Sequence, residues 1–145
     1  MRLYWVKRDL AFGSIIKTWH DVASLRGLGI THVINLLKNR NGKKIRRFDS
    51  VWLPFRDDKK PRPKGFYQRA LKFHKQASRK KRSKLLVMCY HGRSRSASLT
   101  YFLLRSSGVT AANAEKSIRT ARSNAMLPRA YRNSCERFLR KATSP

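Results

Sequence analysis

The segment that most constrains the fold is "LLVMCYHGRSRSASLTYFLL", residues 85–104. Its first four residues form an apolar run with the length of a buried central strand. The apolar residues after position 95 indicate a mostly buried helix, which Gly108 would end. The loop between them, 89–94, is short and polar. A strand that passes through a short loop into a helix is a unit of α/β architecture.

Strands and helices alternate along the rest of the chain, and helices crowd its end. We expect strands at 3–6, 10–13, 30–37 and 50–55, and helices at 19–29, 65–80, 110–123 and 128–141. The 145 residues suffice for one domain with a real core and are too few for two ordinary domains. The sequence therefore predicts a single α/β domain over 1–145, with a helical C-terminal half.

A thiol in the polar loop suggests chemistry there. Cys89 is followed by Gly92, Arg95 and Ser96, and the loop amides would converge near the N-terminus of the next helix, which is a ready-made anion site. The amides, the helix dipole and Arg95 would all favour the thiolate of Cys89. The guanidinium of Arg95 can clamp two phosphate oxygens. A thiolate beneath a bound phosphate is an in-line nucleophile.

The alternative is that Cys89 only ends a core strand and that the nearby arginines are surface charge. Cys135 provides an internal comparison, because it lies on an expected helix without a glycine cradle, and we interpret it as structural. The two cysteines have no metal-type or redox-type spacing. We expect reduced thiols, no metal and no cofactor.

The loop "CYHGRSRS", residues 89–96, resembles the phosphate-binding signature of the cysteine-dependent dual-specificity protein phosphatases. The resemblance covers almost the whole chain, including "AFGS" at 11–14, "LGITHVINL" at 28–36 and an acidic loop at 57. It implies a compact catalytic domain with a small, mixed, mostly parallel sheet flanked by helices. It also implies that Cys89 forms a phosphocysteine, that Arg95 binds the phosphoryl group and that Ser96 helps the thiolate to leave.

The resemblance further implies that the loop backbone cradles the phosphate oxygens. The residues of this cradle would be Tyr90, His91, Gly92, Arg93, Ser94 and Arg95. Gly92 suits a tight cradle because it has no Cβ and tolerates unusual backbone angles. His91 could face the pocket mouth or be a solvated residue of the rim.

A phosphate ester also needs a carboxyl group to protonate its leaving oxygen, and the same group can later act as a base. The family places this aspartate on a loop before the cysteine, often as Pro-x-x-Asp, and Pro54 with Asp57 match that spacing. We therefore expect Asp57 to be the general acid, with Asp58 as the fallback. The alternative is that the two aspartates merely make a turn.

Two departures from the family pattern affect the expected site. Met88 stands where the family usually has a histidine, and a thioether cannot replace the imidazole in stabilising the thiolate. Tyrosine-specific relatives also have an extra N-terminal loop that grips phosphotyrosine. This chain begins almost at its first strand, so we expect a shallow pocket open to several phosphoesters.

The charge of the chain is unusual, with 35 Lys and Arg against 7 Asp and Glu, a net charge of +28. Such a surface attracts polyanions such as nucleic acid or anionic lipid. Basic clusters at 38–47 and 79–84 are candidate contacts for a polyanion, although each could be a solvated loop or a nuclear signal. No apolar run has the length of a membrane span. We expect an intracellular protein in the cytoplasm, with the nucleus as the alternative.

Three functions are compatible with these features. The first is a phosphatase for phosphotyrosine and phosphoserine or phosphothreonine in proteins. The second is a phosphatase for a non-protein phosphate, either a lipid headgroup or an RNA 5′ phosphate; "GRSRSA" at 92–97 is similar to the loop of phosphatases for phosphatidylglycerophosphate. The third is a non-catalytic module that binds polyanions. The presence of nucleophile, arginine, serine and acid together disfavours the third.

Overall fold

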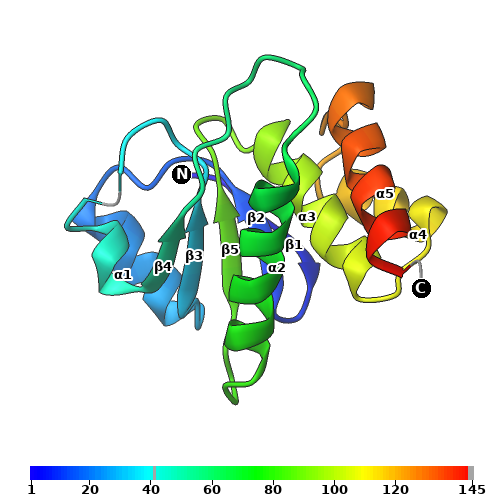
Figure 1. Cartoon of the computed structure of the whole chain (residues 1–145). Helices are drawn as coiled ribbons and strands as arrows, with labels where there is room; N and C mark the ends of the chain where they lie inside the picture. The colour runs from blue at the N-terminus through cyan, green and yellow to red at the C-terminus, as the bar shows by residue number, and fades with distance from the viewer. Residues whose placement is uncertain (41, 144–145) are drawn as a thin grey trace.

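A computed structural model describes residues 1–40 and 42–143 of the chain (Figure 1). The strands are β1 (Leu3–Lys7), β2 (Leu10–Gly13), β3 (His32–Asn35), β4 (Asp49–Trp52) and β5 (Leu85–Met88). The α-helices are α1 (Trp19–Gly27), α2 (Lys64–Ser78), α3 (Arg95–Ser106), α4 (Ala111–Ala121) and α5 (Arg129–Thr143), and a short 3₁₀ helix, η1, spans Ile45–Arg47. Each expected helix and strand is present at its expected place, with boundaries shifted by a few residues.

The five strands form one sheet in the order β1-β2-β5-β3-β4. The β1–β2 pair is antiparallel, whereas β2–β5, β5–β3 and β3–β4 are parallel. The sheet is therefore mixed and mostly parallel, as the sequence predicts. Since parallel strands end at the same edge, the segments that follow β2, β3 and β5 meet there, and ligands bind at such edges in α/β folds.

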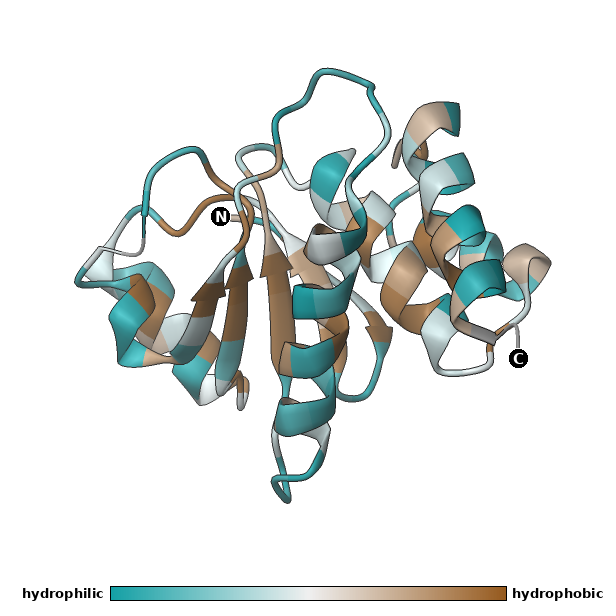
Figure 2. Ribbon diagram, in the orientation of Figure 1, coloured by the Kyte–Doolittle hydropathy of each residue, from teal (hydrophilic) through white to brown (hydrophobic). Residues whose placement is uncertain are grey.

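Helices cover both faces of the sheet because the inner strands are apolar on both sides. On β5, Leu85 and Val87 pack into the core formed with α2, α3, α4 and α5, while Leu86 and Met88 pack into a second core with α1. Figure 2 shows the apolar strands at the centre and the hydrophilic outer faces of the helices. The buried strand that precedes the cysteine is thus held from both faces.

The structure shortens two expected strands and adds one turn to an expected loop. Strand β3 spans His32–Asn35 rather than 30–37. Strand β4 ends at Trp52 rather than at 55. Beyond the two strand ends, the N–H of Phe55 still donates to the carbonyl of Leu36, which follows β3. Within the basic cluster 38–47, η1 forms because Ile45 is buried against the α1 side of the sheet. In the part of the chain that the structure describes, no helix is both long and apolar enough to cross a bilayer.

Candidate active site

The loop after β5 curls around the sulfur of Cys89. This cysteine is 2% exposed, and its N–H donates to the carbonyl of Gly13 on β2 at 3.2 Å. The N–H of Gly92 donates a hydrogen bond to Cys89 Sγ at 3.2 Å. The thiol of Cys89 in turn donates to Oγ of Ser96, in the first turn of α3, at 3.2 Å. One loop amide and one buried hydroxyl therefore already face the sulfur.

Gly92 is required at its position for two independent reasons. Its φ is +65°, a left-handed conformation that residues with a Cβ rarely adopt. A Cβ on Gly92 would also lie 2.6 Å from the carbonyl carbon of Gly13 and 2.7 Å from the nitrogen of Ser14. The loop after β5 is thus pressed directly against the backbone that follows β2, and the sequence pattern gave no indication of that contact.

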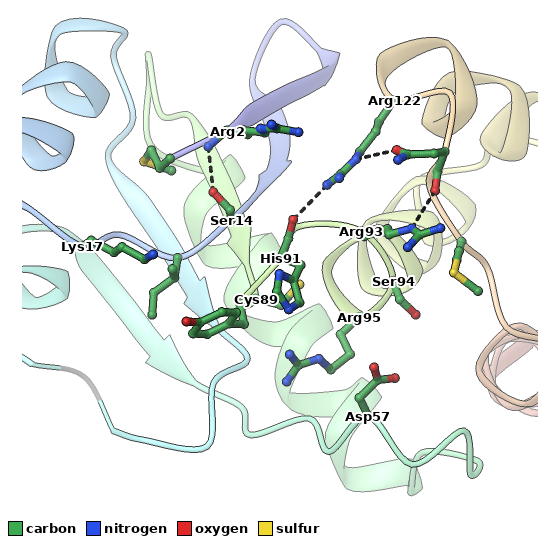
Figure 3. A pocket seen from close by; sticks show the side chains of 15 residues that line it. Arg2, Ser14, Lys17, Asp57, Cys89, His91, Arg93, Ser94, Arg95 and Arg122 are labelled. Atoms are coloured by element: carbon green, nitrogen blue, oxygen red, sulfur yellow. Dashed lines mark hydrogen bonds between the residues drawn. The ribbon is translucent and has the colours of Figure 1, made fainter.

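Arg95 and Asp57 line the same cavity of about 720 Å³ as Cys89. Figure 3 shows the Arg95 guanidinium and the Asp57 carboxylate on the same side of the loop. Arg95 is the first residue of α3, and its Nη1 donates to the carbonyl of Phe55 at 3.1 Å. Phe55 lies two residues before Asp57, so this bond links the arginine to the segment that carries the expected acid.

Asp58 differs from Asp57 in its surroundings. Its Oδ1 accepts hydrogen bonds from the N–H of Lys60 at 2.9 Å and from Nη2 of Arg62 at 2.5 Å. The hydrogen bond from Lys60 and the charge of Arg62 lower the pKa of Asp58. Asp58 is thus bound to residues of its own loop, and it is Asp57 that lines the cavity with Cys89 and Arg95.

Some of the remaining residues near Cys89 line the cavity, and others are buried behind it. Those that line the cavity besides Cys89 and Arg95 are Tyr90, His91, Arg93 and Ser94. The side chain of His91 is exposed, which leaves it at the rim. Ser96 lies behind the sulfur and is fully buried. The loop therefore faces the cavity with mostly polar and cationic groups.

Met88, at the position of the usual family histidine, is fully buried at the end of β5. Its Sδ accepts a hydrogen bond from the N–H of Ile16 at 3.4 Å. The thioether thus provides an acceptor that joins β5 to the segment after β2. It carries no ionisable group, so it cannot supply the charge of an imidazolium beneath the loop.

Arg122 is a site residue that the sequence analysis did not identify. It follows α4, and its Nη1 donates to the carbonyls of His91 and Gly92 at 2.9 and 2.6 Å (Figure 3). Its Nε donates to Oδ1 of Asn124 at 2.8 Å. Arg122 thus fixes two carbonyls of the loop that surrounds Cys89. Its sequence surroundings are those of an ordinary basic residue at a helix end.

Cys135 lies on the inner side of α5 and is 1% exposed. Burial raises the pKa of its thiol, which keeps it protonated. In the described part of the chain, no group of three or more His, Cys, Asp or Glu side chains has an arrangement that could hold a metal ion.

Comparison with known proteins identifies the same family that the loop at 89–96 resembles. The family model described as "Dual specificity phosphatase, catalytic domain" matches residues 15–137. No curated protein sequence matches the chain.

Solved structures with this fold include a complex of PTPMT1 with PI(5)P, which is 14% identical, has a TM-score of 0.83 and matches over 97% of this chain and 96% of that one. Human DUSP28 is 21% identical, with a TM-score of 0.80 over 98% and 95% of the two chains. A mouse putative dual specificity phosphatase with zinc tungstate is 21% identical, with a TM-score of 0.80 over 96% and 87%. With the family model spanning most of its length, this chain belongs to the dual specificity phosphatases, which are cysteine-based hydrolases of phosphomonoesters.

Proposed function

We propose that the protein hydrolyses phosphomonoesters through a covalent phosphocysteine at Cys89. The observation that carries this proposal is the position of Cys89 Sγ, 3.2 Å from the amide nitrogen of Gly92, in the cavity that Arg95 and Asp57 also line. The backbone N–H groups of 90–95 and the N-terminus of α3 would bind the phosphate oxygens. The planar fork of Arg95 would add a bidentate contact.

The reaction then has two displacement steps. In the first, Cys89 Sγ attacks phosphorus, the bond to the leaving oxygen breaks, and Asp57 gives that oxygen its proton. In the second, the Asp57 carboxylate takes a proton from water as the water oxygen attacks phosphorus. The P–S bond breaks, inorganic phosphate leaves, and the thiolate that returns accepts a hydrogen bond from the hydroxyl of Ser96, which lies 3.2 Å away.

A trapping experiment tests the covalent step. Asp57→Asn should attack an aryl phosphate with a good leaving group, because that step needs no proton, but it should hydrolyse the intermediate slowly. Rapid acid quench and mass spectrometry should find one added phosphoryl group on the peptide that contains Cys89. The peptide with Cys135 should carry none. Turnover without a phosphoryl group on Cys89 would overturn the proposal.

The first substrate class that we propose is phosphotyrosine and phosphoserine or phosphothreonine in proteins. The family to which the chain belongs supports it, since its description as dual specificity fits a protein that accepts more than one kind of phosphoester. The cavity of about 720 Å³ supports it too, because that space exceeds what one phosphoryl group fills. Comparable kcat/KM on phosphotyrosyl and phosphothreonyl peptides would be the expected result.

A lipid headgroup is a second candidate, favoured by the side chains at the mouth of the cavity. Tyr90 and Met126 line the cavity and are 47% and 39% exposed, beside the cations Arg2, Lys17 and Arg93. Exposed apolar and cationic side chains side by side suit the surface of an anionic bilayer. The fold is shared with PTPMT1, whose structure was solved with PI(5)P.

The two basic clusters differ in their place relative to this mouth. The cluster 38–47 starts after β3, at the sheet edge where the cavity is, and ends just before the parallel strand β4, at the opposite edge. Its Lys44 Nζ lies 5.2 Å from the ring centre of the exposed Trp19. The cluster 79–84 precedes β5 and lies at the opposite edge (Figure 1). The start of the first cluster is therefore on the side of the cavity mouth. A polyanion on the second cluster would bind at the far edge, where Lys80 Nζ lies 3.2 Å from Oδ2 of Asp49 at the start of β4.

Vesicle sedimentation distinguishes the two substrate classes. Cys89→Ser protein should bind vesicles with anionic lipid, and Lys17→Gln should weaken that binding about fivefold, as expected for one cation near an anionic surface. Met126→Gln should weaken it as well. Leu28→Gln is the matched control, because Leu28 is similarly exposed but does not line the cavity. Equal losses in all three variants, or no preference for anionic lipid, would rule out the lipid candidate.

A further inference from the structure

The phenol of Tyr131 connects helix α5 to the loop that carries Asp57. Its hydroxyl donates to Oδ1 of Asp57 at 3.0 Å and accepts a hydrogen bond from the N–H of Lys59 at 2.7 Å. A backbone N–H can only donate, so the phenol oxygen must accept from Lys59, and its own proton is directed to the carboxylate. The direction of the Tyr131–Asp57 hydrogen bond is therefore fixed by the backbone.

The ring of Tyr131 is held from several sides. The side chain is 1% exposed, and Phe55 packs edge-on against it with ring centres 4.7 Å apart. The guanidinium of Arg62 lies 5.7 Å from the ring centre. The backbone carbonyl of Tyr131 accepts a hydrogen bond from the hydroxyl of Tyr67 at 3.2 Å. The phenol is thus a rigid donor rather than a mobile surface group.

The loop itself is shaped around this contact. Lys59 has a φ of +55°, which is uncommon for a residue with a Cβ, and it presents its N–H to the phenol. Three residues later, the N–H of Arg62 donates to Oγ of Ser134, also on α5, at 3.2 Å. Two hydrogen bonds from the loop backbone therefore end on α5, and both come from residues that follow Asp57 in the chain.

We propose that Tyr131 is a positioning residue for the acid: it occupies Oδ1 of Asp57, so that the catalytic proton resides on Oδ2. This inference rests on the proposed role of Asp57. Once Asp57 has given its proton to the leaving oxygen, the same hydrogen bond becomes charge-assisted and stabilises the new carboxylate. Burial raises the pKa of Tyr131, and the Asp57 carboxylate adds to the shift, so the phenol remains a donor at neutral pH.

Tyr131→Phe tests the inference because it removes the hydroxyl and keeps the ring. The kcat for a phosphate ester with a poor leaving group should fall about tenfold, the loss typical of a hydrogen bond to a charged group. The KM, and the kcat for an ester whose leaving group needs no proton, should change by less than about twofold. Tyr101→Phe is the matched control, since Tyr101 is equally buried and its hydroxyl donates to Glu136 Oε1 at 2.6 Å instead.

A double-mutant cycle with Asp57→Asn separates the possible outcomes. If Tyr131 acts through Asp57, Tyr131→Phe should have no further effect on kcat in the Asp57→Asn background. A loss that is equal for both esters, or that persists in that background, would overturn the inference and leave the proposed acid intact. If Asp57→Asn alone has no effect, the proposed role of Asp57 fails, and this inference fails with it. Tyr131→Phe should fold, because the N–H that loses its acceptor belongs to the exposed residue Lys59, where water can accept its hydrogen bond.

Discussion

Replacing Cys89 by serine should lower kcat for any aryl phosphate by at least about four orders of magnitude, in the range found when a catalytic nucleophile is lost. A serine hydroxyl is far less acidic and far less nucleophilic than a thiol, so it would not replace the attacking sulfur. The amides of 90–95 and Arg95 are unchanged by the substitution. Binding of inorganic phosphate, measured by calorimetry, should therefore persist while phosphate release stops.

Cys135→Ser is the matched control for this prediction. The Cys135 thiol is as buried as that of Cys89, but it lies on the face of α5 that packs into the core. Burial raises the pKa of the Cys135 thiol. Its replacement should lower the stability of the fold and leave kcat within about threefold. Turnover that survives in Cys89→Ser, or that is lost in Cys135→Ser protein shown to be folded, would contradict the assignment of the nucleophile.

Asp57→Asn should lower kcat by about two to four orders of magnitude for esters with poor leaving groups, because general acid catalysis contributes that much. An amide cannot give a proton to the leaving oxygen. The deficit should shrink as the leaving group becomes more acidic, since departure then needs less protonation. Measuring kcat over a series of aryl and alkyl phosphates gives this dependence directly.

Asp58→Asn provides the comparison for Asp57. Asp58 forms an ion pair with Arg62 and accepts from the N–H of Lys60, so its loss should loosen the loop. We expect a modest fall in kcat that is similar for good and poor leaving groups. If Asp58→Asn instead gave the larger and leaving-group-dependent loss, the acid would be Asp58 and the arrangement around Asp57 would have another purpose.

The sequence predicts best the part of the site whose residues are close together in the chain. The strand Leu85–Met88, the loop after it and the helix that begins at Arg95 are consecutive, and each is specified by its own residues. The short apolar run has the length of a buried strand, and Gly92 permits the left-handed turn that the loop needs. Short-range chemistry therefore predicted the position of Cys89 relative to Arg95.

The part that could not be predicted depends on which segments the sheet brings together. Arg122 and Tyr131 carry no local signal, because a basic residue after a helix and an aromatic residue on its inner face are ordinary features. They reach the site only because α4 and α5 pack against α3 and the loops meet at one edge of the sheet. The contact of Gly92 with Gly13 likewise follows from the parallel pairing of β2 with β5.

The strand order also determines when the protein can fold as it is synthesised. Strand β5 lies between β2 and β3 but follows all the other strands in the chain. On the ribosome, β1–β2 and β3–β4 therefore emerge as two separate pairs with unpaired edges, which invite association with other chains. The strand that joins them pairs with segments far away in the sequence, which is intrinsically slow. Because the loop around Cys89 begins where that strand ends, the nascent chain gains its complete sheet and the surroundings of Cys89 in the same event.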